Sequence, residues 1–290
     1  MSTRRRNSLS SSPVDRVLRW SVIVIALVLS VGPVLYGIIL SVRPFSAVTN
    51  EPLDLLPAPS ELDFSAYWDA LLPASEGGFG LGQFVLNSAL LAIGTVVLSL
   101  LASVFGAYAA ARLRYRGRST TNAIILAVYL FPGIVLAVPL FVMLSRVGLT
   151  GNLIGLLIVY VALTVPVALY MVRNYFLALP ESVEEAALID GCSLPRMLWT
   201  VVLPIAMPGV VATAIYVFMI AWNEYLFALL FLVQSRSLWT APLGISQLTD
   251  FNVPVTVLLA GSIAVTIPVI LAFFFSQRFL VAGLTSGAEK

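Results

Sequence analysis

The sequence contains no histidine, one cysteine and one lysine among its 290 residues. Because histidine is absent and Cys192 is the only cysteine, zinc sites built from His or Cys ligands are excluded. The absence of histidine also excludes His-based catalytic triads, and a single cysteine excludes an internal disulfide. A Walker A loop needs a lysine directly after its glycines, and the single lysine is Lys290 at the last position. The chain therefore has no such site of its own for ATP.

Charged residues are also scarce, at 10% of the sequence against 60% hydrophobic residues, a balance typical of proteins that cross a membrane several times. In lipid the backbone must satisfy its own hydrogen bonds, so each span is expected to be a helix. We predict an all-α membrane protein with six transmembrane helices. The six apolar stretches that reach the required length of about 20 residues are 20–42, 84–111, 122–144, 153–172, 208–233 and 255–275.

The cations predict the orientation in the membrane. If the N-terminus lies inside, only three of the 16 Lys and Arg residues lie outside, namely Arg43, Arg146 and Arg236. Positive residues concentrate on the cytoplasmic side of membrane proteins, so both termini and the loop 175–204 are predicted to be cytoplasmic. The net charge of +2 is explained by this topology, and we expect the lipid bilayer rather than nucleic acid as the partner of these cations.

The composition along the chain predicts its organisation. Residues 1–19, with an arginine triplet and a serine cluster, are expected to be a disordered cytoplasmic leader, and 20–42 to be a retained first transmembrane helix. Residues 43–83 are too polar for the bilayer and are expected outside the cell membrane. The core of five further helices spans 84–275, and 276–290 is expected to be a cytoplasmic tail.

The cytoplasmic loop 175–204 has the pattern of two short helices separated by a glycine. Pro180 suits the first position of a helix, and Gly191 supplies its stop. Ser193 is placed to cap a second helix with Pro195 in its first turn, before the chain returns to the membrane at Leu203-Pro204. We call this segment the elbow.

The first helix of the elbow is acidic, with Glu181, Glu184, Glu185 and Asp190. At three- and four-residue spacings it presents small residues that another protein's groove can approach closely: Val183, Ala186, Ala187 and Asp190. The alternative is an amphipathic helix lying on the bilayer surface, but such helices usually carry Lys or Arg on their polar face. The acidic charge therefore favours a protein partner.

A polar group lies inside the fifth predicted span, at Asn223, Glu224 and Tyr225. A charged residue at the centre of a transmembrane helix costs roughly 2.5 to 3.5 kcal/mol on insertion scales, so Glu224 is expected to face protein or water. We consider these three residues as a possible lining of a translocation path. The alternative for Glu224 is a structural hydrogen bond between helices.

Several motifs together resemble a known family. The run Glu185-Ala186-Ala187, followed by Gly191, Val201 and Leu203-Pro204, resembles the cytoplasmic signature loop of permease subunits in ATP-driven ABC importers. The runs AWNEYLFALLF from Ala221 and QRFLVAGLTSGAEK from Gln277 are similar to the maltose-type, carbohydrate-uptake branch, and to its second, shorter permease. The resemblance covers residues 84–290.

The resemblance implies a type I importer permease in the cytoplasmic membrane that is not itself an enzyme. Its partners would be a homologous second permease, two ATPase subunits and an extracytoplasmic solute-binding protein. ATP and Mg would be bound by the ATPases, with no cofactor in this chain. The residues implied to couple the permease to the ATPases are Glu184, Glu185, Ala186, Ala187, Asp190, Gly191 and Pro204.

Other functions remain as alternatives. The first alternative is the same machinery with glycerol phosphate or another organic solute as its cargo, because the motifs report the machinery more than the cargo. A secondary transporter needs coupling residues of its own inside the membrane, where only Glu224 qualifies. A purely structural membrane scaffold would require neither the acidic elbow nor the C-terminal motif.

Overall fold

The computed structural model describes residues 13–51, 57–249 and 253–286, and within these ranges every regular element is helical. The long helices are α1 (Pro13–Ser41), α4 (Leu81–Arg112), α5 (Arg118–Leu130), α6 (Ala137–Arg146), α7 (Leu153–Ala178), α10 (Leu203–Trp222) and α13 (Val255–Ser286). The shorter elements are α2 (Phe45–Asn50), η1 (Pro59–Glu61), α3 (Ser65–Leu71), η2 (Ala74–Glu76), η3 (Gly133–Leu136), α8 (Glu181–Ile189), α9 (Leu194–Met197), η4 (Leu198–Val202), α11 (Leu226–Leu232), η5 (Arg236–Leu238) and α12 (Ala241–Leu248).

Five helices within the described ranges are long and apolar enough to cross a membrane, or six if α5 and α6 with η3 count as one span. The prediction of six spans is confirmed in this sense, but the third is not a straight helix. The two halves meet at an angle of 87°. The bend lies at Phe131-Pro132, because proline has no N–H for the helix ladder and disfavours helical geometry in the residue before it.

The prediction of one helix over 208–233 is wrong. Helix α10 begins earlier, at Leu203, and ends at Trp222, and after a break at residues 223–225 the short helix α11 begins at Leu226. Apolar residues flank this break on both sides, and the predicted span was drawn across the polar residues Asn223 and Glu224. The break is stabilised by the polar group at Glu224, described below.

The chain termini also differ from the sequence-based expectation. Helix α1 begins at Pro13, so residues 13–19 are helical rather than part of a disordered leader, and residues 1–12 lie outside the described ranges. Helix α13 continues from the last span to Ser286, so most of the predicted tail 276–290 extends that helix. Residues 287–290 lie outside the description.

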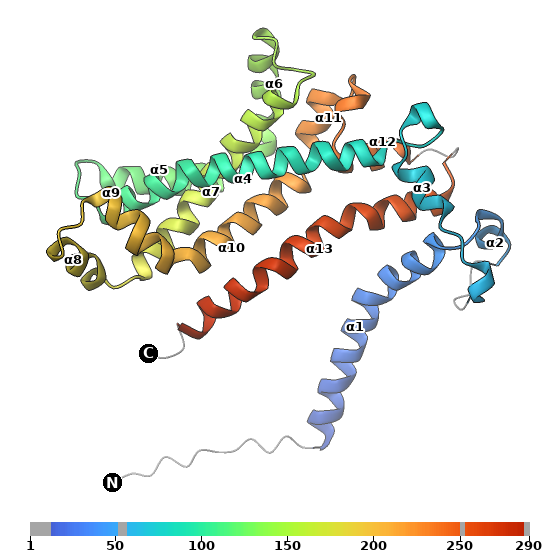
Figure 1. Cartoon of the computed structure of the whole chain (residues 1–290), viewed down its shortest axis with the longest axis horizontal. Coiled ribbons are helices and arrows are strands. Elements are labelled where there is room, and N and C mark those ends of the chain that lie inside the picture. Colours follow the sequence, from blue (N-terminus) through green and yellow to red (C-terminus); the bar gives the residue numbers. More distant parts are fainter. Residues whose placement is uncertain (1–12, 52–56, 250–252, 287–290) are drawn as a thin grey trace.

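The centre of the molecule is a bundle in which α4 packs along α7, and α10 packs against both helices and against α13 (Figure 1). Small residues permit the close approach of α4 and α7: Ala92, Ala107 and Ala168 are fully buried. Between the two helices the buried hydroxyl groups of Ser99 and Thr164 lie 2.7 Å apart in a hydrogen bond. This is the usual way that membrane helices associate, since lipid gives no hydrophobic force between them.

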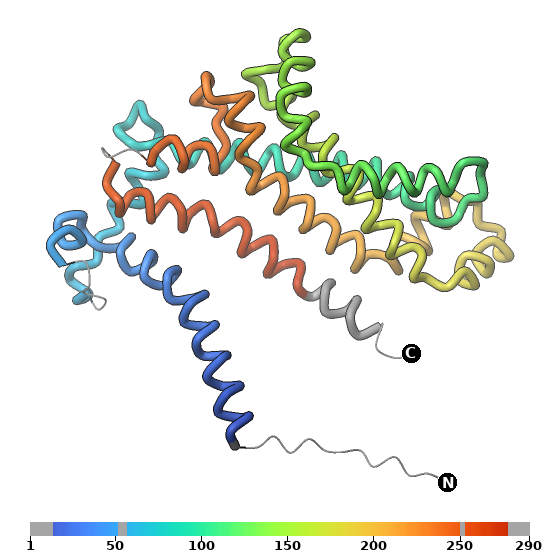
Figure 2. The backbone as a smooth tube through the Cα atoms, turned by 180° about the vertical axis from the view of Figure 1, so that it is seen from behind, coloured from blue at the N-terminus to red at the C-terminus, as the bar shows by residue number. Residues whose placement is uncertain are grey.

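Helix α1 extends away from this bundle, and its main contact within the chain is with α13 (Figure 2). Helices α1 and α13 approach each other at Gly37, where an added Cβ atom would lie 3.7 Å from the side chain of Leu259. Apolar side chains on every side of α1 are exposed, among them Val17, Val24 and Leu29. A helix that is apolar all round requires lipid or another subunit as its surroundings.

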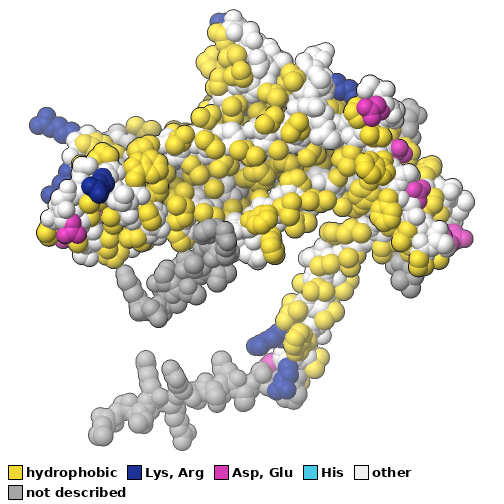
Figure 3. Space-filling model, in the orientation of Figure 1, with side chains coloured by type: hydrophobic (Ala, Val, Ile, Leu, Met, Phe, Trp, Pro, Cys, Tyr) yellow, Lys and Arg dark blue, Asp and Glu magenta, His cyan; other side chains and the backbone are white. Residues whose placement is uncertain are grey.

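Apolar side chains cover the middle of the bundle, while charged side chains gather toward its ends (Figure 3). One end of the molecule holds the elbow and the arginine-rich turn between α4 and α5, residues 112–118. The adjoining ends of α4, α5, α7 and α10 lie together there (Figure 1). At the other end the segment after α1 packs through α3 onto α13 and α4. A hydrogen bond of 2.8 Å between Ser41 and Tyr67 attaches α3 to the end of α1.

Candidate coupling site

The elbow has the predicted glycine break. Helix α8 follows Pro180, which is the N-cap residue rather than the first helical residue, and Asp190 is its C-cap. Gly191 has φ of +80°, the left-handed conformation that favours glycine at the end of a helix. The N–H of Cys192 donates to the carbonyl of Ala187 at 3.0 Å, which satisfies one of the last carbonyl groups of α8.

The second half of the elbow differs from its prediction. Ser193 occupies the N-cap of α9 with Pro195 in the first turn, as expected, but its side chain makes no capping hydrogen bond. From α9 the chain passes through the π-helical turn η4 directly into α10, so Pro204 lies within a continuous helical stretch. The π-helical turn includes Thr200, whose carbonyl is the one that the Pro204 ring would meet in a regular α-helix.

The faces of α8 are distributed differently from the prediction. Ala187 is buried in a core cluster with Phe176 and Met197, so it does not lie on the outward face. The outward side carries Glu185 and Ala186, and it ends at Ile189, which is 86% exposed. The predicted partner face of Val183, Ala186, Ala187 and Asp190 is therefore wrong in part, because Ala187 packs into the chain's own core and Val183 is half-buried.

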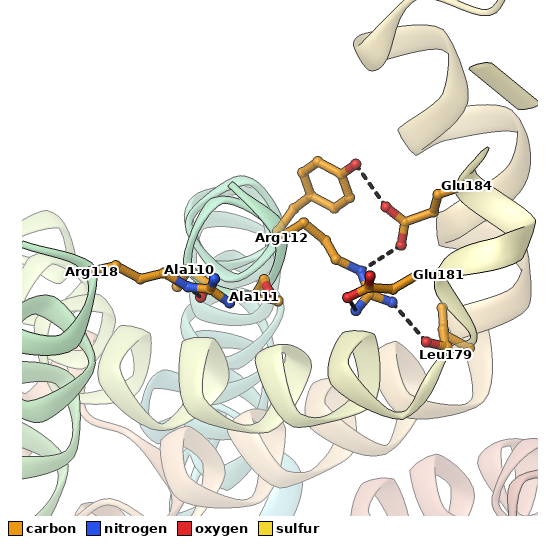
Figure 4. Close-up of polar contacts among 8 residues, drawn as sticks. Ala110, Ala111, Arg112, Arg118, Leu179, Glu181 and Glu184 are labelled. Atoms are coloured by element: carbon orange, nitrogen blue, oxygen red, sulfur yellow. Dashed lines mark hydrogen bonds and ion pairs between the residues drawn. The ribbon is translucent and has the colours of Figure 1, made fainter. Parts of the chain in front are cut away.

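Glu184 is buried against the end of α4 (Figure 4). The Nε of Arg112 donates to Glu184 Oε1 at 2.6 Å, and the hydroxyl of Tyr108 donates to Glu184 Oε2 at 3.0 Å. Arg112 also donates to the carbonyl of Leu179 at 2.8 Å and lies 3.5 Å from the exposed carboxylate of Glu181. We call these groups the Arg112 cluster.

The Arg112 cluster joins three parts of the chain that are distant in sequence: the end of α4, the end of α7 and the start of α8. The side chains of Arg112 and Glu184 are only 8% and 11% exposed, so their ion pair is weakly screened by water. Removing one partner of a buried pair leaves an uncompensated charge, which is costly. The elbow is thus fixed to the bundle through α4, and not only through the covalent chain to α7 and α10.

Sequence reasoning missed Arg112 and Tyr108 as members of this site. It assigned Arg112 only to the membrane topology. One signal was available: Tyr108 and Arg112 are four residues apart at the end of a predicted span, and therefore lie on one face of a helix. The turn between α4 and α5 carries four arginines, Arg112, Arg114, Arg116 and Arg118, and they make different contacts. Arg118 donates at 3.1 Å to the carbonyl of Ala110 and so satisfies a backbone group at the end of α4.

The polar group in the fifth span has a structural role at Glu224. Its carboxyl group accepts hydrogen bonds from the N–H groups of Phe227 and Ala228 at 2.7 and 3.0 Å, which satisfies the first turn of α11. It also accepts from the hydroxyl of Tyr160 on α7 at 2.8 Å. The alternative reading, a hydrogen bond between helices, thus describes Glu224, whereas Asn223 and Tyr225 are exposed and stay candidates for a path.

The comparison with protein families identifies the chain. Residues 102–286 match the family described as the binding-protein-dependent transport system inner membrane component. The chain belongs to this family of importer permeases. The matched range includes the elbow, Arg112, Glu184 and Glu224. It leaves out α1 and the segment that follows it.

Several relatives resemble the permease over most of its length. The trehalose transport system permease protein SugB of Mycobacterium tuberculosis is 34% identical over 261 residues, which cover 89% of this chain and 92% of that protein. The inner membrane ABC transporter permease protein YcjP of Escherichia coli is 37% identical over 72% of this chain and 74% of its own length. The trehalose/maltose permease MalG of Thermococcus litoralis is 35% identical over 71% of this chain and 75% of that relative.

Solved structures confirm the fold. A chain of a bacterial ABC transporter involved in the import of the acidic polysaccharide alginate aligns with a TM-score of 0.79 and 27% identity. The alignment covers 92% of the permease and 98% of that chain. The MetNI methionine ABC transporter in inward-facing conformations shares the fold at a TM-score of 0.52 and 20% identity, over 70% of the permease and 94% of that chain.

These findings confirm the resemblance to carbohydrate-uptake importer permeases and the all-α importer architecture. The permease is a multi-pass protein of the cytoplasmic membrane and a transport component rather than an enzyme. The direction in which the termini point stays a prediction from the arginines. The roles of the elbow residues and of Asn223 and Tyr225 also stay predictions.

For Glu224 the structure leads to a first testable prediction. In the permease, Glu224→Gln removes an acceptor from Tyr160 or from the first turn of α11, and we expect a loss of about 1 to 3 kcal/mol in the free energy of unfolding. The KM for uptake should not change, because the carboxyl group faces α7 and α11. Thermal unfolding and uptake kinetics, compared with Asn223→Ala, would check this. A raised KM without any loss of stability would instead place Glu224 on the solute path.

Proposed function

We propose that this chain is one of two homologous permease subunits of an ABC importer for a sugar or oligosaccharide. Two ATPase subunits that bind ATP and Mg would dock on the elbow, and an extracytoplasmic solute-binding protein would deliver the cargo. The family supports this assembly, and similar proteins are named for trehalose or trehalose/maltose transport. We further propose that the elbow and both termini are cytoplasmic, because most of the arginines flank that side.

The arrangement of α8 carries the proposal of coupling. Its outward side presents the carboxylate of Glu185 beside the small side chain of Ala186, and Ile189 projects at its end. An exposed apolar tip beside small residues on a short helix fits a groove of another protein. Asp190 and Gly191 form the turn behind this tip, and Pro204 lies where the elbow continues into α10.

The inward side of α8 supplies the route for movement. Closure of the ATPases on nucleotide would displace α8, and the Arg112 cluster would transmit that displacement to α4 while η4 transmits it to α10. Because the ion pair is buried and has further hydrogen bonds on both partners, it holds the two elements together as one unit. The bundle would thereby open alternately toward the two sides of the membrane.

The experiment that tests this function uses the complex co-purified with its ATPases and reconstituted with the solute-binding protein in nanodiscs. ATPase activity would be measured with maltose, trehalose, longer oligosaccharides and sn-glycerol 3-phosphate as probes. We expect stimulation by a sugar, and a decrease of about tenfold in that stimulation for Glu185→Ala, equivalent to about 1.4 kcal/mol of lost coupling.

The matched control is Glu76→Ala, which removes an exposed carboxylate from η2 in the segment before α4. This variant should retain the stimulation of the wild type. If no ATPase co-purifies with the permease, the importer function is wrong. If sn-glycerol 3-phosphate stimulates and no sugar does, the cargo is an organic phosphate, which is the alternative that the motifs left open.

A further inference from the structure

A groove of about 260 Å³ lies where α5, α7 and α10 meet, beside the bend of the third span. Figure 2 shows α5 and α6 meeting at this bend. Tyr129, Phe131 and Tyr216 are aromatic residues of its lining, and Ala162 and Pro166 contribute from α7. Tyr129 is 40% exposed and Tyr216 is 42% exposed, although both lie well inside membrane-spanning elements.

The groove lies deep in the membrane. Tyr129 is eleven residues after the start of α5, and Pro166 is thirteen after the start of α7, which correspond to about 16 and 20 Å at 1.5 Å per residue. The hydrocarbon core of a bilayer is about 30 Å thick. The groove is therefore near the middle of the bilayer, remote from either water interface.

Backbone polar groups lack helical partners at this depth. Pro166 has no N–H, so α7 supplies no donor four residues on for the carbonyl of Ala162. Pro132 likewise ends the ladder of α5. Non-helical backbone at membrane depth is tolerated where it is buried in protein or lines a cavity that holds water, because lipid cannot hydrogen-bond to it. Lipid is therefore an unsuitable neighbour for this groove.

The chemistry of the lining selects the kind of solute. The described residues that line the groove include no charged side chain, so it offers neither a cation for a phosphate group nor an anion for an amine. It offers instead aromatic faces, two tyrosine hydroxyl groups and carbonyl acceptors. The ring of Tyr170 stacks on Tyr129 with centroids 5.6 Å apart and an angle of 9°, and Tyr129 remains 40% exposed beside this stack.

We propose that this groove, which we call the tyrosine groove, is a contact site for a neutral carbohydrate during its passage, with Tyr129 and Tyr216 as the contact residues. Hydroxyl-rich sugars match neutral donors and acceptors beside apolar ring faces. The volume is slightly below the roughly 300 to 1,000 Å³ of complete ligand pockets, so the groove forms one wall of a site that the second permease completes. The inference rests on the proposed function.

The first test is uptake by proteoliposomes that contain the complete importer, with radiolabelled maltose and trehalose as probes. We expect Tyr216→Ala to raise the KM about tenfold, and Tyr216→Phe, which loses only the hydroxyl group, to raise it about threefold. The maximal ATPase rate at saturating sugar should stay near that of the wild type. If the KM is unchanged in both variants while the wild type imports sugar, the tyrosine groove is wrong and the proposed function stands.

The second test uses the single cysteine of the chain, because Cys192→Ser creates a background without thiols in the permease. In that background Tyr216→Cys should react with a charged, water-soluble methanethiosulfonate, and the transported sugar should protect it. The control Leu98→Cys places a thiol on α4, outside the tyrosine groove, at a position that is 45% exposed in this chain. Leu98 lies on an apolar membrane span, so we expect the charged reagent not to reach this thiol. If Tyr216→Cys is as unreactive as Leu98→Cys, the groove is covered by protein or lipid, which overturns the inference.

Uptake by the wild type separates the proposed sugar import from the proposed contact site in the tyrosine groove. An importer that takes up sn-glycerol 3-phosphate and no sugar contradicts both the proposed cargo and the neutral site. An importer that takes up sugar, in which sugar does not protect Tyr216→Cys, contradicts the contact site alone.

Discussion

Replacing Arg112 with alanine is expected to detach the elbow from α4 and to abolish most of the sugar-stimulated ATPase activity. The substitution leaves the carboxylate of Glu184 buried without its cation, and it removes the donor to the carbonyl of Leu179. Breaking a buried ion pair by removing one partner costs about 3 to 5 kcal/mol. In the folded permease this energy is concentrated on a short helix, so local detachment of α8 is expected before the bundle unfolds.

The measurements are thermal unfolding of the purified complex and ATPase activity with and without sugar. The double variant Arg112→Met with Glu184→Leu removes both charges, and we expect it to recover part of the stability lost in Arg112→Ala. If the double variant regains stability but not the stimulation of ATPase activity by sugar, the ion pair transmits movement from the elbow to α4 as well as stabilising the fold.

The control is Arg116→Ala, which removes the same charge from an exposed position of the same turn. Its effect on stability should stay within about 0.5 kcal/mol, as is usual for exposed positions. If Arg112→Ala behaves like Arg116→Ala in both measurements, the Arg112 cluster has no part in coupling.

The second large effect is expected for Gly209→Ala, at the crossing of α10 and α7. A Cβ atom at Gly209 would overlap the Cγ atom of Tyr175, which is the base of the ring and moves little when the side chain rotates. Either the ring or the helices must move, and such overpacking costs about 1 to 3 kcal/mol, occasionally more. The sign of the change in the free energy of unfolding is informative, because alanine otherwise stabilises a helix interior by about 1 kcal/mol relative to glycine.

Thermal unfolding of Gly209→Ala would measure this cost, and adding Tyr175→Ala should restore most of the lost stability because it removes the ring. The control Gly32→Ala changes a glycine of α1 at which a Cβ would meet nothing within 4 Å, so we expect no loss there. Equal stability of Gly209→Ala and the wild type would mean that α7 and α10 are farther apart than described.

Much of the fold followed from local properties of the sequence. A run of apolar residues long enough for the bilayer favours a helix, because lipid offers no hydrogen-bond partner to its backbone, so the approximate number of spans was predictable. The elbow was predictable for a similar reason: Pro180, Gly191 and Pro195 restrict their own backbone, and the effect of each is confined to its neighbours in sequence.

Breaks inside the spans were harder to predict. The break at residues 223–225 lies between two apolar runs, and it is stabilised because the carboxyl group of Glu224 replaces the missing helical partners of α11 and reaches Tyr160 on α7. The sequence showed the acid but not the direction of its side chain. Direction depends on which helix is adjacent, and that is a property of packing.

The sequence by itself thus determined that this protein has five or six apolar membrane spans and a helical elbow, because hydrophobic length and glycine or proline geometry act locally, and its motifs already resembled those of importer permeases. Only the tertiary structure decided that Glu184 points inward to Arg112 while Glu185 points outward, and that Tyr129 and Tyr216 line one groove. These pairs join residues dozens of positions apart. Their meeting depends on how α4, α5, α7 and α10 cross, which no local pattern encodes.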